Sequence, residues 1–434
     1  MEFNNRSRQF QGLLASLGIA GLWLFLLPQV SNELNFMVIA VVGAVLCLAL
    51  AQQLRSADDY KALLWLLAPF AFLLILTLTT SFFRMPGSTA LREVLLVAAV
   101  FAAGLLFSRI AGLHFALLGV LLGSSAGAVF SWFLVLDGSS SIGAFLEGGI
   151  LTGFAGNRAI DYVSSLMGIA AGLSLMRTTH WSRLGIISLV GFLALTLISS
   201  GSLTGRVALL ATFVAVGLLV LSQTRFQAVA AWSALATGIL GSILLILFFV
   251  FQGRAVAIAS AFSNSDSLEA RFLSWAAILK ALDPAGIVFG YGTTFWQEGS
   301  PAREAANEPL EALGIRGFSI SHSIHLELFQ AFGLVGLVVV GLVIFIILRS
   351  ALSQRKVAGK WAEFSAPWIF VVAIAAQGIT DSVIVYRPVG WLLLGLLCGA
   401  FMSRSKIIEA LPAKIKKRVL GRSTDFAPES VAPR

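Results

Sequence analysis

Long apolar runs joined by short polar connections constrain the fold of this chain more than any other feature. They recur between residues 12 and 402, and each is about 17–25 residues long, enough for an α-helix to cross a hydrocarbon core about 30 Å thick. Hydrophobic residues make up 58% of the 434 positions and charged residues 12%, about half the charged share of a soluble domain. Because the roughly ten-residue alternation of a membrane β-barrel is absent, we predict an all-α polytopic membrane protein.

Hydropathy predicts about twelve transmembrane helices and one long hydrophilic segment. The predicted spans are 12–30, 36–54, 62–83, 92–108, 113–136, 160–177, 182–200, 204–222, 228–251, 323–348, 366–385 and 388–402. They divide the chain into a first group of transmembrane helices in 1–251, a loop in 252–322, a second group in 323–402 and a basic tail in 403–434.

The distribution of basic residues predicts the orientation in the membrane. With a cytoplasmic N-terminus, 20 of the 30 Lys and Arg residues fall on the cytoplasmic side, five in short outer loops and five in 252–322. Basic residues in short loops favour the cytoplasmic side, whereas long loops cross regardless of charge. We therefore expect both termini in the cytoplasm and the long loop outside, in the periplasm if the host has two membranes. This topology explains the net charge of +9 better than a nucleic-acid partner does.

The loop itself contains a predicted surface helix. Residues 265–282 begin with Ser and Asp, carry apolar side chains at helical spacing and stop at Asp283-Pro284, the pattern of an amphipathic helix on the membrane surface. A Gly-Tyr-Gly turn follows at 290–292, and 297–316 is predicted to be a flap.

Two histidines mark the boundary between the loop and the next apolar run, in the stretch 317–337. His322 and His325 fall on the predicted outer face, and Ser323 is a favourable helix start. In one interpretation His322 only marks the beginning of the helix. In the other, the positive end of the helix dipole keeps a first-turn imidazole neutral, so that it can accept a proton, and also attracts phosphate. His325 is interpreted mainly as a structural partner or a lipid-headgroup contact.

Two arginines are candidates for binding a phosphate group. Arg206 stands at the outer end of a span in the sequence SSGSLTGRVALL, and Arg271 lies in the predicted surface helix. Snorkelling explains Arg206 and a solvated helix face explains Arg271 if each is considered alone. Together, two guanidinium forks near one helix start suggest a diphosphate site.

Other polar residues in or near the spans are functional or structural candidates. Asp381 is predicted to end the eleventh span, where it would orient His322, bind a sugar hydroxyl or pair inside the bundle; Gln377 and Glu327 are polar within spans. Three glycines, Gly333, Gly336 and Gly341, suggest close helix packing. No Asp-x-Asp pair, phosphate-binding Gly-rich loop or His/Cys cluster is found in the sequence, so we predict no metal and no other cofactor.

These residues resemble the O-antigen ligase and polymerase superfamily of bacterial inner-membrane glycosyltransferases. The resemblance is concentrated in residues 195–340 and rests on three patterns. They are His322-Ser323 followed by nine residues and Gly333-Leu334-Val335-Gly336; Arg206-x-x-x-Leu210; and Arg271 before Trp275 and Gly290-x-Gly292.

The resemblance implies a metal-independent, inverting transfer of a glycan from undecaprenyl diphosphate onto an acceptor hydroxyl in the periplasm. His322 would be the base, and Arg206 and Arg271 would hold the diphosphate, with Asp381, His325 and Ser323 in support. The acceptor would be lipid A-core in a ligase of lipopolysaccharide biosynthesis, the function we favour, or a second lipid-linked glycan in an O-antigen or exopolysaccharide polymerase. A flippase for lipid-linked oligosaccharides would also need intramembrane polar groups, but not a base at a helix start; a peptidoglycan-polymerase-type enzyme is a further alternative.

Overall fold

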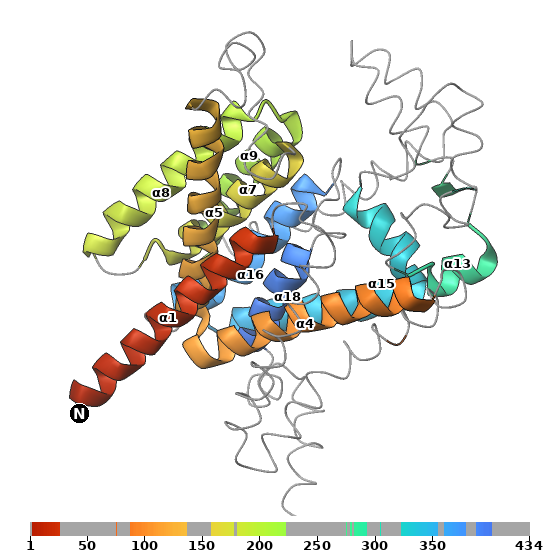
Figure 1. Ribbon diagram of the computed structural model, residues 1–434, viewed down its shortest axis with the longest axis horizontal. Coiled ribbons are helices and arrows are strands. Elements are labelled where there is room, and N and C mark those ends of the chain that lie inside the picture. The colour runs from red at the N-terminus through yellow and green to blue at the C-terminus, as the bar shows by residue number, and fades with distance from the viewer. Residues whose placement is uncertain are drawn as a thin grey trace, which may run out of the picture.

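The described part of the chain is a bundle of α-helices. The computed structural model describes residues 2–26, 75, 87–136, 158–177, 180–222, 275, 278–279, 282–292, 304, 323–354, 360–378 and 388–401. Within these ranges all regular secondary structure is helical (Figure 1). The helices are α1 (Glu2–Leu26), α4 (Gly87–Ala111), α5 (Leu113–Leu136), α7 (Arg158–Leu175), α8 (His180–Ser199), α9 (Leu203–Leu221), α13 (Pro284–Phe289), α15 (Ile324–Ser353), α16 (Trp361–Gln377) and α18 (Pro388–Phe401).

Each of the nine predicted spans that fall wholly or largely in these ranges overlaps a helix. The span predicted at 113–136 has the bounds of α5, and the unusually close pair at 182–200 and 204–222 corresponds to α8 and α9. The turn between α8 and α9 is tight because Gly201 adopts a φ of 69° and Ser202 caps α9 by accepting a hydrogen bond from the N–H of Gly205. The spans predicted at 36–54 and 228–251, and 62–83 apart from Ile75, lie outside the described residues.

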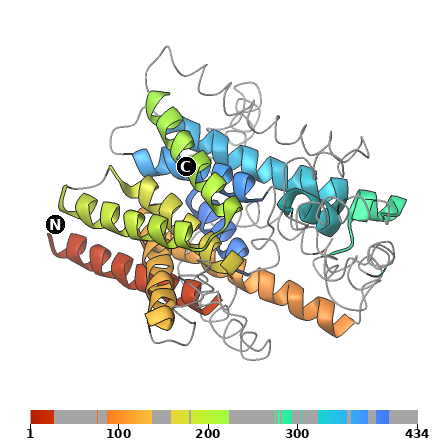
Figure 2. The same cartoon turned by 90° about the horizontal axis from the view of Figure 1, so that it is seen from above.

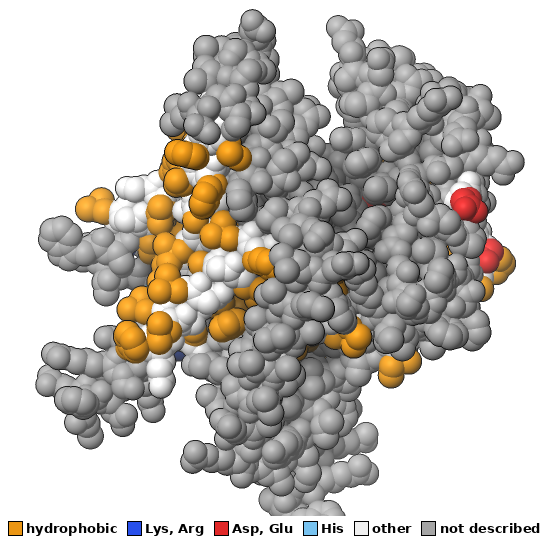
Figure 3. All heavy atoms as spheres, in the orientation of Figure 1, with side chains coloured by type: hydrophobic (Ala, Val, Ile, Leu, Met, Phe, Trp, Pro, Cys, Tyr) orange, Lys and Arg blue, Asp and Glu red, His pale blue; other side chains and the backbone are white. Residues whose placement is uncertain are grey.

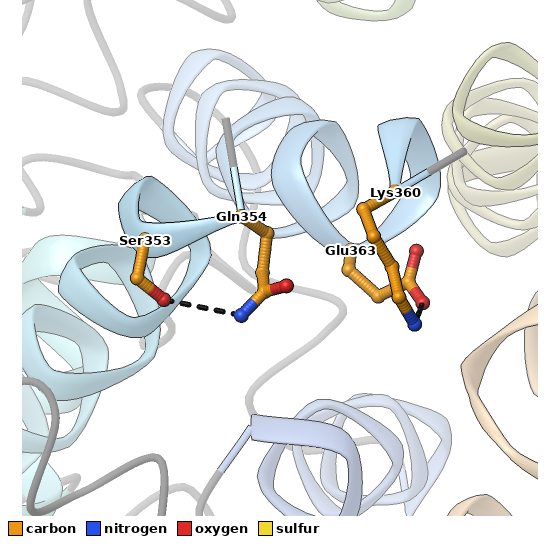
Figure 4. A network of polar contacts seen from close by, with 4 residues as sticks. All are labelled: Ser353, Gln354, Lys360 and Glu363. Carbon is orange, nitrogen blue, oxygen red and sulfur yellow. Dashed lines mark hydrogen bonds and ion pairs between the residues drawn. The ribbon is translucent and has the colours of Figure 1, made fainter. Parts of the chain in front are cut away.

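The helix predicted at 366–385 is displaced toward the N-terminus, because α16 begins at Trp361 and ends at Gln377. Its first turn contains Glu363, which forms an ion pair with the N-cap residue Lys360, 2.7 Å apart (Figure 4). At the other end, the N–H of Gly378 closes the last turn onto the carbonyl of Ile374. Hydropathy missed both ends, since it counts apolar residues and does not detect caps.

The surface and composition of the helices indicate a membrane protein. Three helical stretches are long and apolar enough to cross a membrane, at Leu113–Val135, Thr204–Leu221 and Ile324–Ser353, and five shorter apolar helices accompany them in the described residues. Hydrophobic side chains predominate on the visible described face (Figure 3). Exposed examples include Phe10, Leu17, Phe133, Leu184 and Leu210. Such a surface suits lipid rather than water.

Small residues let several helices pack backbone to backbone. A Cβ at Gly104 of α4 would lie 2.3 Å from the carbonyl oxygen of Leu392 in α18, and one at Gly395 of α18 would lie 2.2 Å from that of Phe101 in α4. This contact is typical of membrane helices, which gain little from hydrophobic burial and associate through close packing.

Candidate active site

Helix contacts define the two ends of the bundle around α7. The beginning of α9 lies beside the beginning of α7, since a Cβ on Gly205 would lie 3.1 Å from the ring of Tyr162. At the other end of α7, the indole N–H of Trp361 donates to the carbonyl of Leu173 over 3.5 Å, and the Arg177 guanidinium lies 4.3 Å from the centre of the Trp361 ring. The helices α7 and α16 therefore run antiparallel.

The beginning of α15 joins the end of the bundle that holds the beginnings of α7 and α9. The backbone N–H of Ile324 donates to the carbonyl of Gly378, which closes α16, over 2.8 Å. The start of α16 lies beside Arg177, at the end of α7, so the other end of α16, at Gly378, points toward the start of α7. The starts of α7, α9 and α15 therefore share one end of the bundle, which we call the site end. Arg206 and the predicted histidine boundary thus lie at the same end, as their assignment to one side of the membrane requires.

Among the predicted site residues, Arg206, Ser323 and His325 are described, whereas His322, Arg271 and Asp381 lie outside the described residues. Ser323 occupies the N-cap position with extended backbone angles (φ −130°, ψ 120°), but its hydroxyl does not cap the helix. The first helical residue is Ile324, so the histidine in the first turn, where the helix dipole acts, is His325. The prediction for His322 lies outside the described residues.

His325 fastens α15 to the end of α16. Its imidazole makes a hydrogen bond with the backbone of Ala375, one of the last residues of α16, whose final carbonyls lack partners in the helix. The Nε2 atom of the ring is buried and has no hydrogen-bond partner among the described residues. The predicted structural role of His325 therefore has a physical basis, and one ring nitrogen is left over.

Arg206 lies in the first turn of α9 and is exposed. Its Nη2 atom donates to the carbonyl of Ile198 in the last turn of α8 over 3.1 Å, a favourable contact because a helix C-terminus carries partial negative charge. Among the described residues, the guanidinium group of Arg206 makes this one hydrogen bond. Since an arginine carries five N–H donors, most of them are left to bind an anion. The structure links the helix of Arg206 to α15 through α16, which packs against both α9 and α15.

A buried polar stripe follows the first turns of α15. It consists of Ser323, Glu327 and Gln330, which are 1%, 0% and 3% exposed. Positions separated by four and then three residues share one face of a helix. Ser323 and Glu327 were singled out from the sequence but Gln330 was missed; the spacing of the three polar residues was the available signal.

Gly333 interrupts α15 at the glycine of the His-Ser-x9-Gly-x-x-Gly pattern. Its backbone angles are φ 61° and ψ −168°, and the helix changes direction there, next to α13 (Figure 1). A Cβ on Gly333 would lie 2.4 Å from the carbonyl oxygen of Val288. Gly333 thus serves close packing, as predicted, against the C-terminal end of α13. Around Gly341, no side chain or other segment of the described residues lies within 4 Å of the position that a Cβ would occupy, so no close helix packing is seen there within the described part of the chain.

The Gly-Tyr-Gly turn predicted at 290–292 binds the interruption in α15. The N–H groups of Tyr291 and Gly292 donate to the carbonyls of Gln330 and Ala331 over 2.7 and 2.9 Å. Both glycines have positive φ. Tyr291 is buried, and its hydroxyl accepts a hydrogen bond from the N–H of Asp283 over 3.0 Å. The first segment of α15, from Ile324 to Phe332, is therefore held at both ends by backbone hydrogen bonds.

The neighbourhood of this turn agrees in part with the predicted surface helix. Trp275, Ile278 and Leu279 are helical, Leu282 is not, and Asp283 caps the new helix α13 beginning at Pro284. The expected stop is confirmed. Trp275 and Ile278 are only 3% and 1% exposed, so these two side chains pack inside the protein rather than facing a membrane surface. Figure 2 shows α13 beyond the end of α15 that is remote from α8.

Asp161, a buried acid at the site end, was missed by sequence reasoning. It lies in the first turn of α7, is 5% exposed, and accepts a hydrogen bond from the hydroxyl of Ser131 over 3.3 Å. An acid within an otherwise apolar helix is a functional candidate in any membrane protein, and that signal was present in the sequence.

Comparison with known proteins agrees with the motifs. Residues 187–341 match the family model described as O-antigen ligase. The matched segment runs from α8 through Arg206, α13 and the interruption at Gly333 to Gly341. No curated protein matches the chain significantly.

Proposed function

Because residues 187–341 identify the chain as a member of the O-antigen ligase and polymerase superfamily, we propose that this glycosyltransferase-type membrane enzyme is an O-antigen ligase. It transfers a glycan from undecaprenyl diphosphate onto lipid A-core at the periplasmic face of the bacterial inner membrane. The observation that carries the proposal is that the family match spans both Arg206 and the start of α15.

His322 is the proposed general base. The oxygen of the acceptor hydroxyl attacks the anomeric carbon of the donor, the bond from that carbon to the diphosphate oxygen breaks, and the hydroxyl proton passes to His322. Attack from the face opposite the leaving group inverts the anomeric centre. The sequence pattern supports this role: His322-Ser323, nine residues and Gly333-Leu334-Val335-Gly336 all lie within the matched segment.

Arg206 and Arg271 are proposed to hold the diphosphate. Charge builds up on the leaving diphosphate as the glycosidic bond breaks, and fixed cations stabilise it most where water is scarce. Arg206 has donors to spare after its contact with Ile198, and a guanidinium fork matches two phosphate oxygens.

The experiment that tests the proposal compares the glycolipids of a deletion strain with those of its parent. A ligase predicts uncapped lipid A-core beside accumulated long polymer. Single repeat units would instead support the polymerase alternative, and normal glycan with donor lipid trapped in the inner leaflet would support a flippase.

Replacing His322 by Ala tests the base. We expect transfer to fall by a factor of about 10²–10⁴, the range for a lost general base, measured in membranes that contain equal amounts of protein. His114→Ala is the matched control, since His114 is an exposed histidine in the first turn of α5 whose electrostatic neighbour is Glu363, at the start of α16 opposite the site end. Near-normal transfer by His322→Ala would contradict the assignment.

A further inference from the structure

The junction between α15 and α16 contains buried polar atoms for which the described part of the chain offers no partner. Gln377, the last residue of α16, is 0% exposed, and within that part neither its amide oxygen nor its amide nitrogen has a hydrogen-bond partner. The buried Nε2 atom of His325 lacks one there too. Two residues from two helices therefore present unpaired groups at one junction.

Such an arrangement is unfavourable unless something else completes it. Buried polar groups in folded proteins are nearly always hydrogen-bonded, and the exceptions call for an explanation such as a ligand or a trapped water. The junction is otherwise firmly made, since Ile324 donates to the carbonyl of Gly378 over 2.8 Å and a Cβ on Gly378 would lie 2.7 Å from that of Ile324. Loose packing does not account for the unpaired atoms.

The chemistry of the unpaired groups fits a hydroxyl. The bond from His325 to the backbone of Ala375 requires an N–H on the ring, because a carbonyl can only accept. In the neutral ring Nε2 is then an acceptor, and Gln377 offers one acceptor and two N–H donors. A hydroxyl group both donates and accepts, so it can donate to the ring nitrogen and can pair with either end of the amide. An anion suits the pair less well, because the Nε2 lone pair of His325 would repel it and neither side chain carries a positive charge.

The junction also lies next to the proposed base along the chain. His322 comes three residues before His325, and the N–H of Ile324, between them, is tied to α16. A saccharide held at the junction is therefore bound only three residues along the chain from the proposed base. This position favours the acceptor saccharide over the lipid-linked donor, whose diphosphate is assigned to the arginines.

We propose that Gln377 and the Nε2 atom of His325 form a hydroxyl-binding subsite for the acceptor saccharide, an inference that rests on the proposed function. Gln377 is in this view a specificity-determining residue that contacts the acceptor. It takes no part in proton transfer.

The test replaces Gln377 by Met, which keeps the length of the side chain and removes the amide. The purified protein in nanodiscs receives lipid-linked glycan extracted from the host as donor and purified host lipid A-core as acceptor. We expect KM for lipid A-core to rise about tenfold, the effect of losing one hydrogen bond, while kcat and KM for the donor change less than about threefold.

Thermal unfolding without substrate provides a second readout. If Gln377 serves the acceptor, Gln377→Met keeps or raises the melting temperature, because it removes a buried amide that has no partner among the described residues. A structural amide paired through water would lower it. Gln354→Met is the matched control: Gln354 lies at the opposite end of α15 (Figure 4), and its amide donates to the Ser353 hydroxyl over 3.1 Å. We expect it to leave both KM values unchanged.

The outcomes separate this inference from the proposed function. If wild-type protein transfers glycan to lipid A-core and Gln377→Met has an unchanged KM for that acceptor, the subsite is wrong and the ligase proposal stands. A rise in the donor KM alone also overturns the acceptor assignment. If wild-type protein transfers nothing to lipid A-core while single repeat units accumulate in the deletion strain, the ligase proposal itself fails.

Discussion

Replacing Gly333 by Ala perturbs the structure at the point where the two halves of α15 meet the loop. The glycine has a φ of 61° and a ψ of −168°, a conformation that costs an alanine about 1–3 kcal/mol. The added methyl group would also lie 2.4 Å from the carbonyl oxygen of Val288 and 2.6 Å from the N–H nitrogen of Gly290. Both neighbours are backbone atoms, so the loop itself must move.

Movement of the loop weakens the hydrogen bonds from Tyr291 and Gly292 to α15. At about 1 kcal/mol each, their loss brings the total destabilisation to about 3–5 kcal/mol. An entropy of unfolding of roughly 2.1 cal/mol/K per residue makes 1 kcal/mol equivalent to about 1.1 °C for a chain of this length. We therefore expect the melting temperature of Gly333→Ala to fall by about 3–6 °C, and the proposed glycan transfer to fall with it because the first segment of α15 loses its anchor.

The matched control is Gly341→Ala, in the same helix. Apart from its own stretch of helix, nothing in the described residues lies within 4 Å of the position of its Cβ, and its φ is not positive, so the substitution adds helix propensity worth about 0.5–1 kcal/mol. The melting temperature of this variant is expected to stay level or rise slightly. Thermal unfolding of both variants in the same nanodiscs is the assay. If Gly333→Ala and Gly341→Ala melt within about 1 °C of each other, the interruption at Gly333 is not the constraint described above.

Three further substitutions test the surroundings of the site. Arg206→Lys keeps the charge and the contact with Ile198 but loses the guanidinium fork, so we expect transfer to fall about tenfold; a rate equal to wild type would mean that Arg206 only snorkels. Tyr291→Phe removes the hydroxyl bound to Asp283 and should destabilise the protein by about 1 kcal/mol in thermal unfolding, whereas an unchanged melting temperature would argue against that anchor. Ser202→Ala removes the N-cap of α9 at a cost of about 1 kcal/mol, and Ser202→Asp, which can also cap, should restore the melting temperature.

Hydropathy and capping residues predicted most of the helical framework. The bounds of α5 and the tight turn before α9 could be predicted because apolar length, glycine and serine act locally. The ends of α16 could not be predicted in this way. The ion pair at Lys360 extends the start of the helix and the cap at Gly378 ends it early, and neither changes the number of apolar residues.

The geometry of the site was less predictable because its contacts are long-range. Gly333 is interpretable from sequence only as a packing glycine, since the loop that requires its positive φ lies more than 40 residues earlier. The link between Ile324 and Gly378 joins segments more than 50 residues apart, and no local pattern announces it. Gln330 and Asp161 had local signals that were overlooked.

The two anchors of the first segment of α15 have a consequence for how such an enzyme diversifies. The segment from Ile324 to Phe332 is fastened by main-chain groups at Gly378, Tyr291 and Gly292, and main-chain groups are the same whatever side chains the segment carries. Side-chain exchanges along the segment therefore leave the attachment in place. Under the proposed function, single substitutions in this segment are a route to new acceptor specificities without loss of the attachment.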